Sequence, residues 1–223
     1  MNLDPAGFIQ TQTQILSPSI IPEIKLHLAA EFTPLWQLTE DRLRQTNVPP
    51  PFWAVAWPGG QGAARYILDN PAVVKDRRVV DFAAGSGLIA IAAMKAGAKS
   101  ARAVDIDPLA LDSVRLNARL NNVVVDISEG LDLTKPYTKA DVIIAGDICY
   151  QQAMSTTLIR FLRLCVEKGT SVYLSDPGRA YLPHEGLVKI AAYDVPTSRD
   201  IEDKDARTAT VWKMEMGKSA EEA

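Results

Sequence analysis

The chain has 223 residues, of which 47% are hydrophobic and 23% are charged, and its formal net charge is −3. This composition is that of a globular protein and excludes a disordered, collagen-like or coiled-coil chain. The acidic total argues against a nucleic-acid partner, because nucleic-acid-binding proteins usually present a basic face to the phosphates.

The cysteines and histidines predict no metal site. The chain has two of each, and they lie far apart without the spacing of metal ligands. The longest apolar stretch, Leu88–Met94, is too short to cross a membrane. Met1–Gln14 contains no Lys or Arg, unlike a signal or transit peptide. We therefore expect no metal, no membrane partner and a cytoplasmic location.

Residues 1–50 differ from the rest and are predicted to form an N-terminal helical extension. Apolar residues recur every three or four positions within Glu23–Arg44, which indicates one or two helices with an apolar face. The prolines Pro49–Pro51 close this segment as a stiff connector. We expect the extension to cap the main domain, residues 51–216, and residues 217–223 to form a disordered tail.

From residue 60 onward, predicted helices and strands alternate. Helices are expected at 60–68, 88–96, 108–120 and 153–168, and strands at 78–83, 100–105, 123–127, 141–146, 171–175, 188–195 and 207–214. Such alternation at short intervals is typical of a parallel sheet with helices on both faces. The expected fold is therefore α/β and Rossmann-like, with a seven-stranded, mostly parallel sheet.

The segment Val79–Ala90 combines a strand, a turn of small residues and the start of a helix. Within it, Gly85, Gly87 and Ala90 match the G-x-G-x-x-G/A spacing of a nucleotide-binding turn. Asp105 follows at the end of the next predicted strand, where a carboxylate can accept hydrogen bonds from both hydroxyls of a ribose. The glycines alone would also suit a turn without a ligand, but together with the acid they indicate an adenosine ligand.

The position of Asp81, at the end of the first predicted strand, favours one adenosine ligand over another. A dinucleotide would lay its pyrophosphate on the nearby helix N-terminus, where this carboxylate would repel it. S-adenosylmethionine has no phosphate and carries an ammonium and a sulfonium group, so the acid fits it and disfavours NAD. A turn or helix-capping aspartate is the alternative interpretation of Asp81.

The segment Val79–Asn121 resembles motifs I and II of the seven-strand, S-adenosylmethionine-dependent (class I) methyltransferases. Ala83 stands where this family usually has its first glycine, a change that keeps the turn small. The resemblance implies that Asp105 binds the ribose, while Asp107 is expected to cap the following helix. A looser likeness implies that Glu129-Gly130 lies near the adenine.

Asp147 and Tyr150 follow the predicted strand 141–146 at its carboxyl end, where ligands bind in open parallel sheets. Many methyltransferases of planar amides and bases carry Asn/Asp-Pro-Pro-Tyr here, but this chain keeps only the acid and the tyrosine. A carboxylate suits an aliphatic amine that arrives as a cation. The Asp-x-x-Tyr spacing resembles the protein-lysine branch of the family, which implies that Asp147 orients the amine and Tyr150 lines its channel.

Two further segments resemble that branch. Pro51–Gly60 is similar to its tryptophan-proline loop, which lies against the cofactor, and Ser175–Arg179 is similar to the lysine methyltransferases of the electron transfer flavoprotein β subunit. The resemblance, from about Pro18 to Met214, implies S-adenosylmethionine as cofactor and that flavoprotein subunit as protein partner. The implied substrate-binding residues are Trp53, Tyr150 and Arg179. The implied cofactor-binding residues are Trp57, Asp81, Ala83, Gly85, Gly87, Asp105, Ile106, Glu129, Gly130 and Asp147.

Other interpretations stay open. The aromatic residues Trp53, Trp57 and Tyr150 would also serve in the core, Arg179 as an ordinary loop cation, and Cys149 as a small buried residue. The acidic run Asp200–Asp205 is expected to be a solvated hairpin, although a basic peptide could bind it. For the whole chain, the alternatives are a methyltransferase of a ribosomal protein or a small-molecule amine, a non-catalytic nucleotide-binding module and an NAD oxidoreductase.

Overall fold

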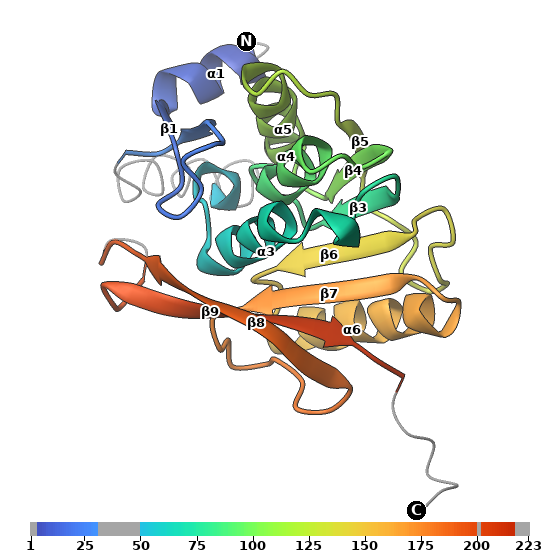
Figure 1. Ribbon diagram of the computed structural model, residues 1–223. Helices are drawn as coiled ribbons and strands as arrows, with labels where there is room; N and C mark the ends of the chain where they lie inside the picture. The colour runs from blue at the N-terminus through green and yellow to red at the C-terminus, as the bar shows by residue number, and fades with distance from the viewer. Residues whose placement is uncertain (1–3, 31–49, 200–201, 217–223) are drawn as a thin grey trace, which may run out of the picture.

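The computed structural model describes residues 4–30, 50–199 and 202–216, which fold around one seven-stranded sheet (Figure 1). The strand order is β5-β4-β3-β6-β7-β9-β8, with the first five strands parallel and β9 antiparallel to both neighbours. The strands of this sheet are β3 (Arg78–Phe82), β4 (Ser100–Asp105), β5 (Asp126–Glu129), β6 (Val142–Gly146), β7 (Ser171–Asp176), β8 (Leu187–Pro196) and β9 (Ala206–Met214). The predicted α/β, mostly parallel architecture is confirmed.

Helices cover both faces of the sheet. On one face lie α3 (Pro58–Asp69), α4 (Leu88–Lys95) and α5 (Pro108–Leu120), and on the other lies α6 (Gln152–Glu167) (Figure 1). The short 3-10 helices are η1 (Phe52–Ala54) and η2 (Pro71–Val73). In the described part of the chain, no helix is long and apolar enough to cross a membrane.

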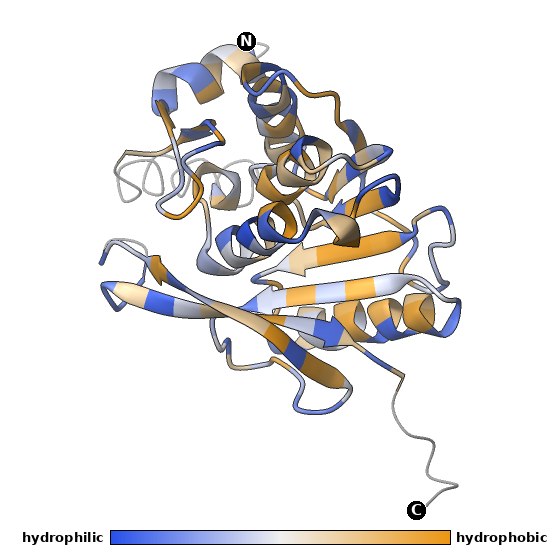
Figure 2. Ribbon diagram, in the orientation of Figure 1, coloured by the Kyte–Doolittle hydropathy of each residue, from blue (hydrophilic) through white to orange (hydrophobic). Residues whose placement is uncertain are grey.

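The central strands are apolar along their length because both of their faces are covered. In β6, Ile143 packs in the cluster that contains Phe161 and Leu162 of α6, whereas Ile144 packs in the cluster that contains Ile67 of α3. Figure 2 shows β3 and β6 in orange, while the outer strands β8 and β9 mix blue and orange. Burial of each such apolar side chain contributes about 1.5–3 kcal/mol to the stability of the fold. The sheet therefore gives the site a rigid support.

The N-terminal part consists of α1 (Pro5–Gln12) and a hairpin of β1 (Gln14–Leu16) and β2 (Leu26–Leu28). The predicted helix Glu23–Arg44 is therefore wrong where β2 lies, and its later residues lie outside the described part. Asn117 of α5 and Asn121, which directly follows that helix, explain the difference, because their side-chain oxygens accept hydrogen bonds from the backbone N–H groups of His27 and Lys25, respectively. These contacts across the chain hold the segment extended, although its local apolar spacing suits a helix.

Most predicted elements from residue 60 onward agree with the structure within one or two residues, the usual uncertainty of element ends. The third strand is an exception, because β5 begins at Asp126 and not at Val123. Its ladder starts where Asp126 pairs with Arg102 of β4, and Val124 is 80% exposed. The predicted tail, 217–223, lies outside the described residues, and the division into extension, domain and tail stays a prediction.

Candidate functional site

A cavity of about 360 Å³ opens at the carboxyl ends of β3, β4 and β6, where the strand order reverses and open sheets bind ligands. The predicted site residues that line it are Trp53, Trp57, Ala83, Gly85, Asp105, Ile106, Asp147, Tyr150 and Arg179. The other predicted residues, Asp81, Gly87, Glu129 and Gly130, are not among its lining residues. The cavity therefore joins most of the expected cofactor residues to both expected catalytic residues.

The turn after β3 needs left-handed backbone at three positions. The φ angles of Ala83, Gly85 and Gly87 are 57°, 51° and 77°. A Cβ added to Gly87 would lie 2.9 Å from a methyl carbon of Val114 in α5, so this glycine permits close packing as well as an unusual φ. Ala83 adopts the left-handed conformation at a cost of roughly 1–2 kcal/mol, which explains why a glycine is usual at its position.

Asp105 ties the end of β4 to the glycine turn. Its Oδ2 atom accepts a hydrogen bond from the backbone N–H of Gly85 at 2.8 Å, and its Oδ1 atom accepts one from that of Asp107 at 3.0 Å. Each oxygen keeps a second acceptor position, as the expected ribose contact requires. Asp107 caps α5 by accepting a hydrogen bond from Leu109, which confirms that prediction.

We expect Asp105→Asn to weaken the binding of S-adenosylmethionine by about 10- to 100-fold, because a hydrogen bond to a charged group contributes about 1.5–3 kcal/mol. Isothermal titration calorimetry measures this loss. Asp112→Asn, at a residue of α5 that does not line the cavity, is the control and should bind normally. Unchanged affinity of the Asp105 variant would contradict the ribose assignment.

Asp81 is buried and is not among the cavity-lining residues. Its Oδ2 atom accepts a hydrogen bond from the backbone N–H of Ala90 in the first turn of α4, at 2.9 Å. Its Oδ1 atom is buried without a hydrogen-bond partner in the structure, and burial raises the pKa of this carboxyl to about 8. The residue thus supports a helix, as one interpretation expected, and also offers a buried acceptor that a cationic group or water would satisfy.

Asp147 follows β6 with a φ of 57° and is almost completely buried. Its Oδ2 atom accepts hydrogen bonds from the backbone N–H groups of Gly59 and Gly60, at the N-terminus of α3. Its Oδ1 atom accepts two from Arg179, at 3.1 Å from Nε and 2.7 Å from Nη2. Burial raises the pKa of Asp147 to about 6, although Arg179 and Gly59 oppose that rise. A carboxylate has about four acceptor positions, so an incoming amine would find those of Asp147 occupied.

The N-terminus of α3 packs directly on the ends of β6 and β7. A Cβ added to Gly59 would lie 2.3 Å from the carbonyl oxygen of Ser175 and 2.4 Å from Oδ2 of Asp147. One added to Gly146 would lie 2.6 Å from the backbone nitrogen of Gly60. Pro51–Gly60 was expected to lie against the cofactor, and this second role was not predicted, although the paired glycines after Trp57-Pro58 were a signal for it.

Aromatic side chains form one wall of the cavity. The ring of Phe52 makes edge-on contacts with Trp57 and with Tyr150, at centroid distances of 5.9 and 5.7 Å. Tyr150 is 41% exposed, which excludes the alternative that it is a core aromatic. Trp53 is 1% exposed and packs in the cluster of Ile9, so it fills core while lining the cavity.

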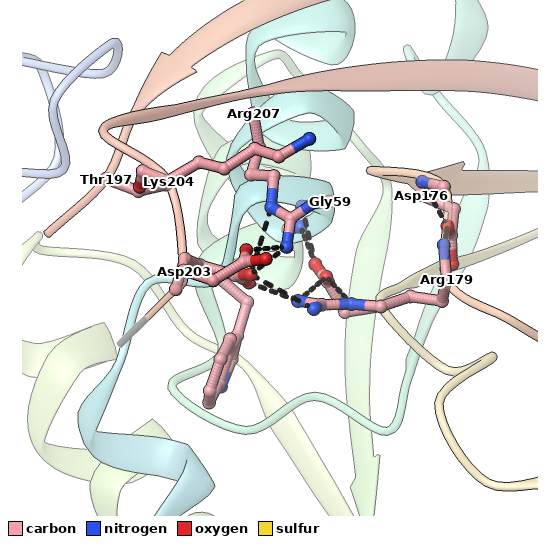
Figure 3. Close-up of polar contacts among 12 residues, drawn as sticks. Gly59, Asp176, Arg179, Thr197, Asp203, Lys204 and Arg207 are labelled. Carbon is pink, nitrogen blue, oxygen red and sulfur yellow. Dashed lines mark hydrogen bonds and ion pairs between the residues drawn. The ribbon is translucent and has the colours of Figure 1, made fainter. Parts of the chain in front are cut away.

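The guanidinium of Arg179 lies at the cavity between two acids. Besides Asp147 it contacts Glu202, which precedes β9, and its Cζ atom lies 5.8 Å from the ring centre of Trp57. Figure 3 shows the side chains of Arg179 and Arg207 converging on the loop between β8 and β9, in which Asp203 is labelled. Glu202 was missed, because an acidic run usually belongs to a solvated hairpin, yet this side chain is 3% exposed.

The remaining predicted residues lie at the border of the site or away from it. Gly130 donates a backbone hydrogen bond to the carbonyl oxygen of Asp105, which places the end of β5 beside the cavity. Burial raises the pKa of the Cys149 thiol to about 12, so it is not a nucleophile near neutral pH. Within residues 4–30, 50–199 and 202–216, no group of three or more His, Cys, Asp or Glu is arranged to hold a metal ion.

The chain is similar to known methyltransferases. A family model described as ribosomal protein L11 methyltransferase (PrmA) matches residues 66–171. The electron transfer flavoprotein β-subunit lysine methyltransferase of Danio rerio is 36% identical over 221 residues, covering 94% of this chain and 83% of that protein. Its counterpart from Homo sapiens is 35% identical, covering 94% of this chain and 82% of that protein.

The fold is also found among solved structures. An RNA methyltransferase from Salinibacter ruber in complex with S-adenosyl-L-homocysteine has a TM-score of 0.50 and 18% sequence identity, covering 71% of this chain and 94% of that one. At this identity the likeness shows a shared fold. It therefore agrees with the predicted class I architecture.

Proposed function

The chain belongs to the family of electron transfer flavoprotein β-subunit lysine methyltransferases and is an S-adenosylmethionine-dependent protein-lysine methyltransferase, and we propose that its substrate is the β subunit of an electron transfer flavoprotein. The observation that carries the proposal is that the same cavity is lined by Gly85 and Asp105 and by Asp147 and Tyr150. The names of the relatives support the choice of substrate, because the alignment spans most of both chains.

The charges around the cavity fit S-adenosylmethionine better than a dinucleotide. Asp105 lines it, and Asp81 offers a buried oxygen without a donor near the N-terminus of α4. Arg179 also lines it, but its charge is balanced by Asp147 and Glu202. A pyrophosphate would meet the carboxylate of Asp105, whereas a cationic cofactor without phosphates complements it and favours the ionised form of Asp81.

We expect the binding of S-adenosylmethionine to release nearly one proton per molecule at pH 6.5. The pKa of Asp81 is about 8 in the ligand-free protein, so its carboxyl is mostly protonated at that pH, and a bound ammonium group favours the ionised form. Calorimetry in buffers of different ionisation enthalpies measures the release. Asp81→Asn still offers an oxygen to Ala90 and should release none. Equal binding heats in all buffers would contradict the role of Asp81.

The same raised pKa determines how pH affects the ligand-free protein. Because the folded-state pKa of Asp81 lies above the ordinary value of 3.8, its neutral form stabilises the fold fully below pH 3.8. That contribution is lost as the pH rises through about 8. A bound cation near the carboxylate offsets the loss, so the cofactor should stabilise the protein more at pH 8 than at pH 6.

For transfer, the chain must hold a neutral lysine amine in line with the methyl group, which the bound cofactor supplies on a sulfonium. Neutralising an amine with a pKa of about 10.4 costs roughly 4.6 kcal/mol at pH 7. The apolar lining, which includes Ile148, Met154 and Leu158, lowers that cost by disfavouring the charged amine. We propose that Phe52 and Tyr150 pack around the aliphatic stem of the lysine.

Positive charge appears on the nitrogen during transfer, and a nearby fixed negative charge favours that change. We propose that Asp147 supplies this charge. Because Gly59, Gly60 and Arg179 already donate to its carboxylate, it acts through its field and by fixing the cavity wall. The faces of Trp57 and Tyr150 add attraction for the cationic product.

The substrate is tested with the purified chain, methyl-labelled S-adenosylmethionine and the electron transfer flavoprotein of the same organism. We expect label on lysines of the β subunit, identified by mass spectrometry, and label accumulating at least about 100-fold more slowly with the Asp147→Asn enzyme. Ribosomal protein L11 and a mixture of small amines are the comparison substrates, because the family model that matches is that of an L11 methyltransferase. Label in either of these, with none in the β subunit, would overturn the proposal.

We also propose a cytoplasmic location. Cys149 and Cys165 are both buried and unbridged, as expected of a chain that folds in a reducing compartment. Cell fractionation tests this, and recovery of the protein from an extracellular or membrane fraction would contradict it.

A further inference from the structure

Arg179 uses both edges of its guanidinium group on buried acids. The edge formed by Nε and Nη2 donates to Oδ1 of Asp147, at 3.1 and 2.7 Å. The edge formed by Nη1 and Nη2 donates to Oε2 and Oε1 of Glu202, at 3.3 and 2.5 Å. We call Asp147, Arg179 and Glu202 the carboxylate clamp. Through it, the loop between β8 and β9 reaches the end of β6.

Glu202, like Asp147, is buried and held by several polar contacts. Its side chain is 3% exposed, and Arg207 of β9 also donates to its Oε2 atom, at 3.1 Å from Nε. Its backbone N–H donates to the carbonyl oxygen of Ser198, and Thr197 bonds across the loop to Lys204 and Asp205. Figure 3 shows Thr197, Asp203 and Lys204 in this loop, beside Arg207.

The neighbouring residue, Asp203, offers a natural comparison. It carries the same charge in the same loop and pairs with Arg207, but its side chain is 72% exposed. In the described part of the chain, the ion pairs of Arg179 are with Asp147 and Glu202, and not with Asp203. The loop therefore holds one acid that reaches the site and one that faces solvent.

We propose that Glu202 is a positioning residue for the methyl transfer: by holding one edge of Arg179, it keeps the other edge on Asp147. This inference rests on the proposed function for its role in catalysis, whereas the clamp itself is a property of the structure. A long arginine side chain loses much rotamer freedom when it is fixed. Two buried carboxylates, each taking two donors, offset that loss better than one.

The clamp acts on the charge state of Asp147. The groups that face its carboxylate are the N–H groups of Gly59 and Gly60 from α3, Asp176 from β7, and Arg179 from the loop after β7. Burial and Asp176 raise the pKa of Asp147, while Arg179 lowers it. If Arg179 is no longer held by Glu202, Asp147 loses a cation and takes up a proton at a higher pH.

The test measures the pKa of Asp147 directly, by carbon-13 NMR of protein labelled at aspartate carboxyl groups, with the signal assigned through Asp147→Asn. In the wild-type protein we expect a pKa of about 6. In Glu202→Gln the loss of a nearby negative charge would by itself lower this pKa, so the rise of about one pH unit that we expect reports the departure of Arg179 from Asp147. Asp203→Asn removes the same charge one residue away and should leave the pKa of Asp147 unchanged. An unchanged or lower pKa of Asp147 in Glu202→Gln would overturn the proposal.

A second readout links the clamp to catalysis. The lysine amine must lose a proton before transfer, so the logarithm of the transfer rate should rise with a slope of one against pH. Below the pKa of Asp147, this carboxyl must lose a proton as well, so the slope should be two. The break should move to higher pH in Glu202→Gln and stay in place in Asp203→Asn, while the affinity for S-adenosylmethionine stays the same in both. An unshifted break in Glu202→Gln would refute the positioning role.

The test also distinguishes misfolding of the Glu202→Gln variant from failure of the proposed function. If Glu202→Gln does not fold, Arg179→Lys carries the test, since a lysine cannot bridge both carboxylates and should raise the pKa of Asp147 as well. If the wild-type protein transfers no methyl group to any substrate, the proposed function fails. The NMR titration still decides whether the clamp exists.

Discussion

Replacing Asp147 by asparagine is expected to lower the turnover of methyl transfer by about 100- to 1,000-fold, the usual effect of losing one fixed electrostatic contact in an active site. The affinity for S-adenosylmethionine should change less than about threefold. Asparagine has nearly the same shape, tolerates the φ of 57° and still offers an oxygen to Gly59 and Gly60. It removes the negative charge and places an amide NH2 group where the carboxylate oxygen accepts from Arg179. Single-turnover rates and calorimetry measure the two quantities separately.

The control for this variant lies at the other end of the same strand, β6. Asp141 immediately precedes β6, pairs with Arg78 and is partly exposed, so Asp141→Asn makes the same chemical change at the amino end of the strand. It should retain wild-type turnover and cofactor affinity. Normal turnover of Asp147→Asn would remove this acid from the mechanism, and a loss confined to cofactor affinity would move it to the cofactor site.

Replacing Gly59 by alanine should destabilise the protein by about 3–5 kcal/mol, a value in the range for forced overpacking with loss of a buried network. The added Cβ would meet the carbonyl oxygen of Ser175 at 2.3 Å and the carboxylate of Asp147 at 2.4 Å. Either α3 moves away or Asp147 leaves its place, and both outcomes break the site. Thermal unfolding should show a midpoint lower by about 10 °C, with turnover lost as well.

The next residue provides the matched control. A Cβ added to Gly60 meets nothing within 4 Å, and alanine favours a helix over glycine by about 1 kcal/mol. Gly60→Ala should therefore be neutral or stabilising and should keep its activity. If the two alanine variants unfolded at the same temperature, the close approach of α3 to β6 and β7 would be wrong.

The sequence predicted those parts of the fold that depend on local patterns. The strands and helices from residue 60 onward were recognisable because periodicity and turn residues lie within each segment. The glycine turn and Asp105 were recognisable because a phosphate-free adenosine site needs small residues and an acid at fixed spacing. By contrast, β2 is held extended by Asn117 and Asn121, which lie about 90 residues away in the chain.

The same limit explains what was missed in the site. Nothing near Asp147 in the sequence indicates that Gly59 and Arg179 would occupy its carboxylate. Glu202 lies in a run of acids whose composition indicates solvent, and its burial arises when Arg179 and Arg207 meet it. Both sets of contacts form only because the sheet order brings particular strand ends together, and no local sequence pattern predicts that order.

The hydrogen bond between Gly59 and Asp147 joins residues 88 positions apart. Contacts of such high sequence separation form late, because the entropy lost in closing a long loop must be offset by other interactions first. Between these two residues the chain builds β3, β4, β5 and β6, so the acid can reach its final environment only when this half of the sheet has assembled. Partly folded chains should therefore have no methyltransferase activity, and during refolding the recovery of turnover should trail the recovery of helical structure.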